Sequence, residues 1–172
     1  MHRKDAGFTL IEAVVVLAVA SLLVATALPA FQGSLQRTRA IGAMHLLSTD
    51  LAVARSTAIQ RRQAVLVCPR AADDRCGDYS DWSAGWLVFL DPDGNRQPDR
   101  PGEILRVNQA SGTRLRLPSS RRFVRYQADG RSAGTNLTIH VCSLDGLLGD
   151  VVVNNLGRVR TSKPARETAC PR

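Results

Sequence analysis

Residues 8–30 form a long apolar segment, and no other stretch of this 172-residue chain restricts the possible folds as strongly. As a helix, the segment would extend roughly 35 Å, which is enough to cross the hydrocarbon layer of a bilayer. Glu12 is its only ionisable side chain. An ionised carboxylate in hydrocarbon costs roughly 2.5 kcal/mol or more. Something must therefore compensate for Glu12, or the segment is not a simple membrane span.

Two general interpretations fit an apolar N-terminal segment. The flank "MHRKDAG" is short and basic through Arg3 and Lys4, so it should stay on the cytoplasmic side. A secretory signal peptide could be cleaved at the A-x-A pattern of Ala25 and Ala27, although the apolar stretch is long for one and contains Glu12. A plain signal anchor leaves the carboxylate unexplained.

The stretch "GFTLIE" (7–12) resembles the processing motif of type IV prepilins and type II secretion pseudopilins. The resemblance implies that a prepilin peptidase cleaves between Gly7 and Phe8 and that Phe8 is then N-methylated. Glu12 becomes the fifth mature residue, and Pro29 becomes the twenty-second, where many pilins also carry a proline. The new α-amine can pair with a carboxylate at low dielectric. In this family the pairing joins Glu12 to the N-terminus of a neighbouring pilin, which makes Glu12 an assembly residue.

Together, the motif and the hydrophobic pattern divide the chain into four parts. The resemblance implies that residues 1–7 are a leader peptide and 8–30 the transmembrane and filament-core helix; residues 31–62 are expected to form the amphipathic half of that helix, and 63–172 a β-rich head with a basic C-terminal region. Apolar residues of the amphipathic half recur in steps of three and four, which predicts one buried stripe: Ile41, Met44, Leu47, Leu51, Ala54 and Ala58. Arg39, Asp50 and Arg55 are expected largely off this stripe.

After residue 63 the sequence changes to short β-type runs separated by Gly, Pro and Asp. Strands are predicted at 64–68, 85–91, 103–107, 113–117, 122–127, 137–142, 151–155 and 157–161. In 113–117, alternation places Arg114 and Arg116 on one face and Leu115 and Leu117 on the other. An antiparallel sheet system packed on the second half of the helix is the simplest architecture.

The head also resembles one branch of the pilin family. A helix, "VLVCP", a Cys-bounded loop, "WSAGWLVFLDPDGN" and "EILRV" follow in an order similar to FimT/GspH-type minor pilins and pseudopilins. This resemblance covers roughly residues 50–110. It implies an α+β fold in which a long N-terminal helix packs on an antiparallel, β-rich head with two sheets. It also implies a single-pass inner-membrane protein with a periplasmic head, which later joins a pilus filament at the cell surface.

The four cysteines allow three pairings. They contain no CxxC pair and no His/Cys cluster, which argues against zinc. An even number of cysteines behind a membrane-targeting segment suggests disulfides formed in an oxidising compartment. We favour Cys68–Cys76 and Cys142–Cys170, because each pair joins sequence neighbours.

Other segments offer weaker signals for a site. The acidic stretch "DPDGNRQPD" (91–99) resembles a calcium-binding loop in composition. Gly94 is at the wrong position for an EF-hand loop, however, and a turn is favoured. Trp82 and Trp86 could stack on bases, although sheet packing is favoured for Trp86. No catalytic or cofactor-binding motif is recognisable. The chain is therefore predicted not to be an enzyme and to hold no cofactor or metal.

The C-terminal third is strongly basic: residues 113–172 contain 11 Lys or Arg against 4 Asp or Glu. This imbalance predicts a directed electropositive surface. If 157–161 is extended, Arg158 and Arg160 project to the same side about 7 Å apart, similar to the phosphate spacing along an extended nucleic-acid strand. Guanidinium groups bind phosphates bidentately, and Gly157 lets a backbone approach closely.

The sequence "GRVR" (157–160) resembles the G-R-x-R signature near the C-terminus of FimT-type minor pilins. The resemblance implies non-specific capture of DNA for uptake in natural transformation, with Gly157, Arg158 and Arg160 as the matching residues. Charge and proximity add Lys163 and Arg166. Three alternatives stay open: a structural GspH-like pseudopilin of type II secretion, a pilus-priming subunit without DNA binding, and arginines that only protect a strand edge from aggregation.

Overall fold

The computed structural model describes residues 9–109, 115–132, 134–144, 146–166 and 168–171. One long helix, α1 (Leu10–Arg61), precedes the strands of the head. The chain divides into two compact units, Met1–Thr38 and Arg39–Arg172. The second half of α1, from Arg39 onward, therefore belongs to the head. The predicted membrane segment ends earlier, at residue 30.

In the first unit, α1 is long and apolar enough to cross a membrane. Its leucine, isoleucine and valine side chains from Leu10 to Leu28, and Phe31, are exposed on all sides of the helix. Exposed apolar surface costs roughly 25 cal/mol per Å² in water. This segment is therefore suited to lipid or to contact with other protein chains. The predicted helix over 8–62 is confirmed from Leu10 to Arg61.

The second half of α1 buries one face in the core of the head. Five of the six predicted stripe residues are buried, and Ile41 is the exception at 38% exposed: Met44, Leu47, Leu51, Ala54 and Ala58. The expectation that Asp50 lies off the stripe is wrong, because this residue is fully buried. Position 50 follows Leu47 by three residues, so helical geometry places it on the same face. Pattern reasoning had treated a carboxylate as a solvent-facing group.

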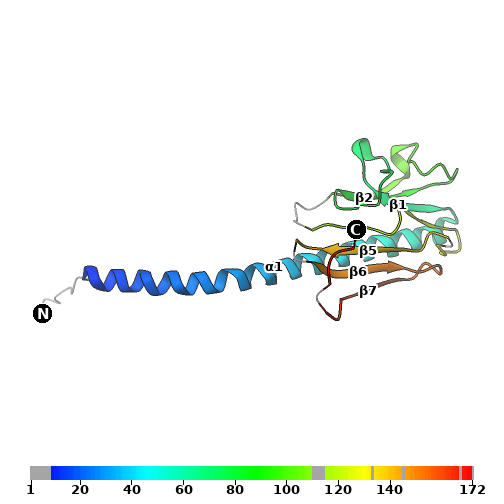
Figure 1. Ribbon diagram of the computed structural model, residues 1–172. Helices are drawn as coiled ribbons and strands as arrows, with labels where there is room; N and C mark the ends of the chain where they lie inside the picture. Colours follow the sequence, from blue (N-terminus) through cyan, green and yellow to red (C-terminus); the bar gives the residue numbers. More distant parts are fainter. Residues whose placement is uncertain (1–8, 110–114, 133, 145, 167, 172) are drawn as a thin grey trace, which may run out of the picture. The chain divides into compact units, whose positions relative to one another are not determined.

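Seven strands form two antiparallel sheets in the described part of the head, which confirms the predicted α+β fold (Figure 1). The first sheet has the order β3 (Ile104–Gln109), β2 (Gly85–Leu90), β1 (Val65–Pro69) and β4 (Val124–Tyr126). The second has the order β5 (Leu137–Cys142), β6 (Leu147–Val153) and β7 (Val159–Ser162). Both sheets contribute to one core with α1.

The strands β1 and β2 are buried along their whole length. Side chains at alternate positions of a strand point to opposite faces, and in these two strands each face packs in a different hydrophobic cluster. Val65 and Val67 join the core around α1, whereas Leu66 joins a second cluster on the opposite face with Leu87 and Phe89. Loops cover that second face, so the central strands meet solvent on neither side.

The predicted strand at 113–117 is wrong in its described part. Arg116 forms an isolated bridge with Cys142, and Pro118 forms another with Asp81. The segment thus changes partner within two residues, and a proline, which has no N–H, cannot donate to a ladder. Leu115 and Leu117 are buried and Arg116 is exposed, as the alternation predicted. Position 114 lies outside the described residues.

Two disulfides close loops of the head. Cys68–Cys76 and Cys142–Cys170 have Cα separations of 5.6 and 5.8 Å. This is the pairing that the sequence favours. By the chain-entropy argument the bridges stabilise the fold by about 2.5 and 3.5 kcal/mol. The second bridge holds the C-terminal residues against the start of β6, where the Leu147 N–H also donates to the Thr168 carbonyl at 2.9 Å.

Candidate functional site

The turn between β6 and β7 carries the predicted basic motif. Asn154 organises this turn: its side-chain oxygen accepts hydrogen bonds from the N–H groups of Leu156 (3.1 Å) and Arg158 (2.9 Å). Its carbonyl accepts from the Gly157 N–H at 2.8 Å, and its own N–H donates to the Arg158 carbonyl at 3.2 Å. These four bonds fix where Arg158 leaves the turn to enter β7.

Gly157 is buried and has a φ of +74°. A Cβ at this position would overlap the carbonyl oxygen of Gly130 and lie 3.2 Å from Tyr126 Cε1. Only glycine combines this left-handed conformation with such a close contact. The close approach that Gly157 permits is therefore to Gly130 of the same chain, not to a ligand. Gly157 acts as a positioning residue for the arginines that follow it.

The loop 127–132 packs against the β6–β7 turn and forms hydrogen bonds with it. Ser132 is buried, and its hydroxyl and N–H donate to the carbonyls of Asn154 (2.7 Å) and Asn155 (3.1 Å). The Gly130 carbonyl accepts from Arg55 Nε at 3.0 Å, and a Cβ on Gly130 would lie 2.6 Å from Ile59 Cδ1. The β6–β7 turn thus packs on the loop 127–132, and this loop packs on the C-terminal end of α1.

Tyr126 fills the space beside Gly157 as an apolar ring. Its side chain is fully buried, and its hydroxyl has no hydrogen-bond partner among the described residues. Burial raises the pKa of the Tyr126 hydroxyl well above its usual range, and the charge of Arg55 opposes this effect only in part. Tyr126 is therefore neutral at physiological pH and contributes packing rather than charge.

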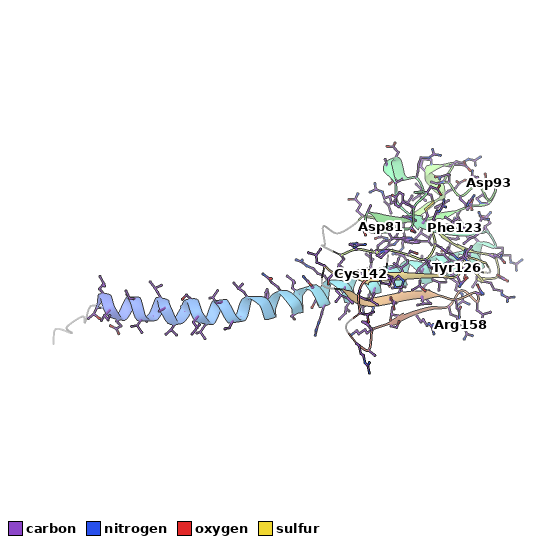
Figure 2. All side chains as sticks on the ribbon, in the orientation of Figure 1. Asp81, Asp93, Phe123, Tyr126, Cys142 and Arg158 are labelled. Atoms are coloured by element: carbon purple, nitrogen blue, oxygen red, sulfur yellow. A yellow bond between two sulfur atoms is a disulfide. The ribbon has the colours of Figure 1, made fainter. Side chains whose placement is uncertain are left out.

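Arg158 directly precedes β7, and Arg160 lies within this strand. Both side chains are exposed, and partly buried Val159 lies between them against the core. Figure 2 shows Arg158 projecting from the surface of the head. On an extended strand the two arginines point the same way about 7 Å apart. β7 pairs only with β6 in the described residues, so Arg160 lies on an edge strand and Arg158 directly precedes it.

Lys163 and Arg166 are exposed too, but they lie away from this pair. Arg158 hydrogen-bonds to Asn154 at one end of β7, whereas Ser162 pairs with Asp150 near the other end. Five residues of extended chain separate Arg158 from Lys163 by roughly 17 Å. The predicted group of four basic residues is therefore split into a compact pair and two residues beyond the far end of the strand.

The four basic side chains have no internal partner in the part of the chain that the structure describes. None of them forms an ion pair or a side-chain hydrogen bond with another described residue. Elsewhere in the head four arginines form ion pairs with acids: Arg70–Asp74, Arg106–Asp50, Arg122–Asp78 and Arg125–Asp91. The guanidinium donors of Arg158 and Arg160 are thus available to an external anion.

A cavity of about 660 Å³ on the outer face of β1 also contains arginines, but these are already engaged. Arg122 pairs with Asp78, and Arg121 Nε donates to the Asn136 carbonyl at 2.9 Å. Arg96 lies 5.3 Å above the ring of Phe123. The basic groups of this cavity therefore contribute to the packing of its own walls.

Both tryptophans belong to the core, so the base-stacking alternative is wrong for each of them. Trp82 is fully buried, and its indole N–H donates to the Arg121 carbonyl at 3.4 Å. Trp86 is 3% exposed and donates to Asp50 Oδ2 at 2.8 Å. Neither ring face is accessible to a nucleic-acid base.

The acidic stretch 91–99 forms the predicted turn, and several of its polar side chains form hydrogen bonds or ion pairs with other residues of the head. Asp91 is buried, pairs with Arg125 and accepts from the Arg96 N–H at 3.1 Å. The Asn95 amide donates to both oxygens of Asp99 at 3.1 and 3.2 Å. Among the described residues, no three His, Cys, Asp or Glu side chains lie close enough to hold a metal ion.

Asp50 is the important polar residue that sequence reasoning missed. Its carboxylate accepts hydrogen bonds from Trp86 Nε1 (2.8 Å), Arg106 Nη1 (3.1 Å) and the Asn108 amide. These bonds join α1 to β2 and β3. The only signal in the sequence was the position of a carboxylate at a stripe position of an otherwise apolar helix face.

Glu12 lies in the first turn of α1, where its N–H donates to Thr9 Oγ1 at 3.3 Å. Its side chain is exposed. The positive end of the helix dipole stabilises a carboxylate there by about 0.3–1 kcal/mol. This is less than the roughly 2.5 kcal/mol cost of a carboxylate in hydrocarbon, so most of the cost is left for another cation to offset. Gly7 and Phe8 lie outside the described residues.

Comparison with known families gives two matches. The family model described as type II transport protein GspH matches residues 43–157. The prokaryotic N-terminal methylation motif matches residues 2–28. The first match ends at Gly157, so Arg158, Arg160, Lys163 and Arg166 lie beyond it. No curated protein matches the chain.

Two crystal structures of the type IV minor pilin FimU from Pseudomonas aeruginosa strain PAO1 are similar to this fold. The form in space group P21 is 19% identical, with a TM-score of 0.58, and the alignment covers 78% of this chain and 97% of FimU. The form in space group P65 is 18% identical, with a TM-score of 0.54 and coverages of 76% and 98%. At this identity the similarity concerns the fold.

Proposed function

The chain belongs to the family described as type II transport protein GspH, and from this premise we propose that it is a DNA-binding minor pilin of a type IV pilus. The family and the fold are those of pilin structural subunits, and we propose no catalytic role. The methylation motif implies processing by prepilin peptidase and assembly with other pilins. The DNA would be captured for uptake in natural transformation.

One observation supports DNA binding most directly. Arg158 directly precedes the edge strand β7 and Arg160 lies within it; both side chains are exposed, and neither has an acidic partner among the described residues. Guanidinium groups at this spacing suit successive phosphates of a nucleic-acid backbone. Backbone contacts carry no sequence information, so binding would be non-specific and strongly dependent on salt. Gly157 would support the pair by fixing the turn, and Lys163 and Arg166 would extend the positive field along β7.

The test replaces both arginines and measures affinity for duplex DNA as a function of salt. The full chain in neutral detergent micelles is titrated into a labelled duplex, and binding is followed by fluorescence anisotropy. Arg158→Gln/Arg160→Gln should reduce the slope of log K against log salt by about 1.8, because each lost phosphate contact removes about 0.9.

The matched control is Arg75→Gln/Arg100→Gln, which removes the same charge from two exposed positions of the head. This control should keep most of the slope. If Arg158→Gln/Arg160→Gln, the double variant of the β6–β7 hairpin, binds DNA like the wild type, the assignment of the site is wrong. If both double variants weaken binding equally, net charge and not the hairpin governs affinity.

A second candidate is a structural pseudopilin of type II secretion or a pilus-priming subunit without DNA binding; the family, that of the type II transport protein GspH, favours the pseudopilin. In that case Arg158 and Arg160 would only discourage edge-to-edge association of β7. The wild-type chain would then show no measurable retention of DNA at moderate salt. The same titration therefore distinguishes the two functions.

We also propose that residues 1–7 are a leader and that cleavage between Gly7 and Phe8 creates a methylated N-terminus. The head would then face the periplasm until assembly. The exposed position of Glu12 in the first turn of α1 supports this, since the helix dipole alone cannot offset its cost in hydrocarbon. An α-amine of a neighbouring subunit would supply the missing cation. Mass spectrometry of membrane-extracted protein should find a mature chain that begins at N-methylated Phe8, and any other mature end contradicts the proposal.

A further inference from the structure

The loop 127–132 brings a further basic residue, Arg131, next to the β6–β7 turn. Both chain neighbours of Arg131 contact that turn. On one side, Gly130 lies in van der Waals contact with Gly157, so closely that a Cβ on Gly157 would overlap the Gly130 carbonyl. On the other, the Ser132 N–H donates to the Asn155 carbonyl at 3.1 Å. The backbone of Arg131 therefore runs alongside residues 155–157, immediately before Arg158.

The side chain of Arg131 is exposed and uncommitted. It forms no ion pair or side-chain hydrogen bond with another described residue. The acid in the same loop is Asp129, which is also exposed and whose Oδ1 accepts from the Arg131 N–H at 2.9 Å. Arg131, Arg158 and Arg160 thus outnumber this single carboxylate, and the local field stays positive.

Other arginines at this end of the head are less suited to an external anion. Arg55 Nε already donates to the Gly130 carbonyl. Arg61 lies in the last turn of α1, where the partial negative charge of the helix end attracts its guanidinium. Arg131 is the residue that combines open donors with a backbone held against the turn.

We propose that Arg131 is a third phosphate-contacting residue and that the DNA footprint crosses from β7 onto the loop 127–132. This inference rests on the proposed DNA-binding function and deepens it. The loop is held in place before any ligand binds, because Arg55 fixes the Gly130 carbonyl and Ser132 is buried beneath the turn. The loop then loses little conformational entropy on binding, which favours contacts from this loop over contacts from a loop without such support.

The test uses the full chain in neutral detergent micelles and a labelled DNA duplex across a salt series. Arg131→Gln should weaken binding by roughly five- to tenfold at 0.1 M salt and lower the log–log slope by about 0.9. The triple variant, which adds Arg158→Gln and Arg160→Gln, should lower the slope by about 2.7. Asp129→Asn keeps the acceptor for the Arg131 N–H but removes the negative charge, so it should strengthen binding. Thermal unfolding checks that each variant keeps the wild-type fold.

The outcomes separate this inference from the function on which it rests. If the wild-type chain does not retain DNA, the proposed function fails. If the wild type binds and the hairpin double variant is weakened, but Arg131→Gln behaves like the control Arg75→Gln, only the inference about Arg131 is overturned. A loss for Arg131→Gln with partial rescue by Arg131→Lys supports it, because lysine restores the charge without the bidentate geometry.

Discussion

Replacing Asp50 with alanine will lower the free energy of unfolding of the head by about 3–5 kcal/mol. The carboxylate is fully buried and accepts hydrogen bonds from Trp86, Asn108 and Arg106. Without it, the buried Trp86 indole N–H and the half-buried Asn108 amide lose their acceptor, at roughly 1–3 kcal/mol for a fully buried donor. Arg106 contributes less to the loss, because its side chain is 44% exposed and can turn to water.

The measurement is a denaturant titration of the full chain, followed by near-ultraviolet circular dichroism. Both tryptophans lie in the core of the head, so this signal reports on the head. Asp50→Asn keeps the shape and one acceptor oxygen and should give a smaller loss. The control is Asp73→Asn, at an exposed position with a φ of 56° that asparagine tolerates, and it should change stability by less than about 0.5 kcal/mol. A loss below about 1 kcal/mol for Asp50→Ala would show that the buried network contributes little.

Replacing Gly157 with alanine will destabilise the head by about 3 kcal/mol and weaken DNA binding without changing any charge. The added Cβ would overlap the Gly130 carbonyl, and the φ of +74° is itself unfavourable for alanine by about 1–2 kcal/mol. Gly130 cannot move away easily, because Arg55 holds its carbonyl and Ile59 lies behind its Cα. The turn must therefore shift, and Arg158 with it.

Gly134 supplies a matched control for this substitution. Its φ is +76°, but a Cβ there would meet nothing within 4 Å. Gly134→Ala should therefore show only the conformational loss, about 1–2 kcal/mol, and leave DNA binding unchanged. The difference between the two variants isolates the contact of Gly157 with Gly130. Equal losses, or unchanged affinity for Gly157→Ala, would mean that the glycine of the motif does not position the arginines.

Local patterns of the sequence predicted most of the fold. The apolar segment and the three-and-four spacing of Leu47, Leu51, Ala54 and Ala58 determined the helix, because helix periodicity depends on near neighbours in the chain. Short β-type runs located seven strands within a few residues for the same reason. The run at 113–117 failed because its pairing depends on two distant partners, Cys142 and Asp81.

The candidate site was only half predictable. Extended geometry predicts that Arg158 and Arg160 share one face, since two residues of strand bring side chains to the same side; the structure shows both side chains exposed, with Arg158 just before β7 and Arg160 within it. Lys163 was grouped with them by sequence proximity, which ignores the length of a strand. The spacing of Asp50 from Leu47 indicates its buried position, but its partners Trp86 and Asn108 lie far along the chain. The contact of Gly130 with Gly157 also joins distant segments. No local pattern encodes such contacts.

The bridge between Cys142 and Cys170 encloses β6, β7 and all four predicted basic residues in a covalent ring. Exposed loop tips with small or polar residues are preferred sites of proteolytic nicking. A single cut anywhere between these cysteines leaves both fragments attached to the head, and the hydrogen bonds between β6 and β7 keep them paired. Release of the arginine-bearing strand needs a second event, either another cut or reduction of the bridge. The ring should therefore keep the exposed segment attached to the head after a first cleavage.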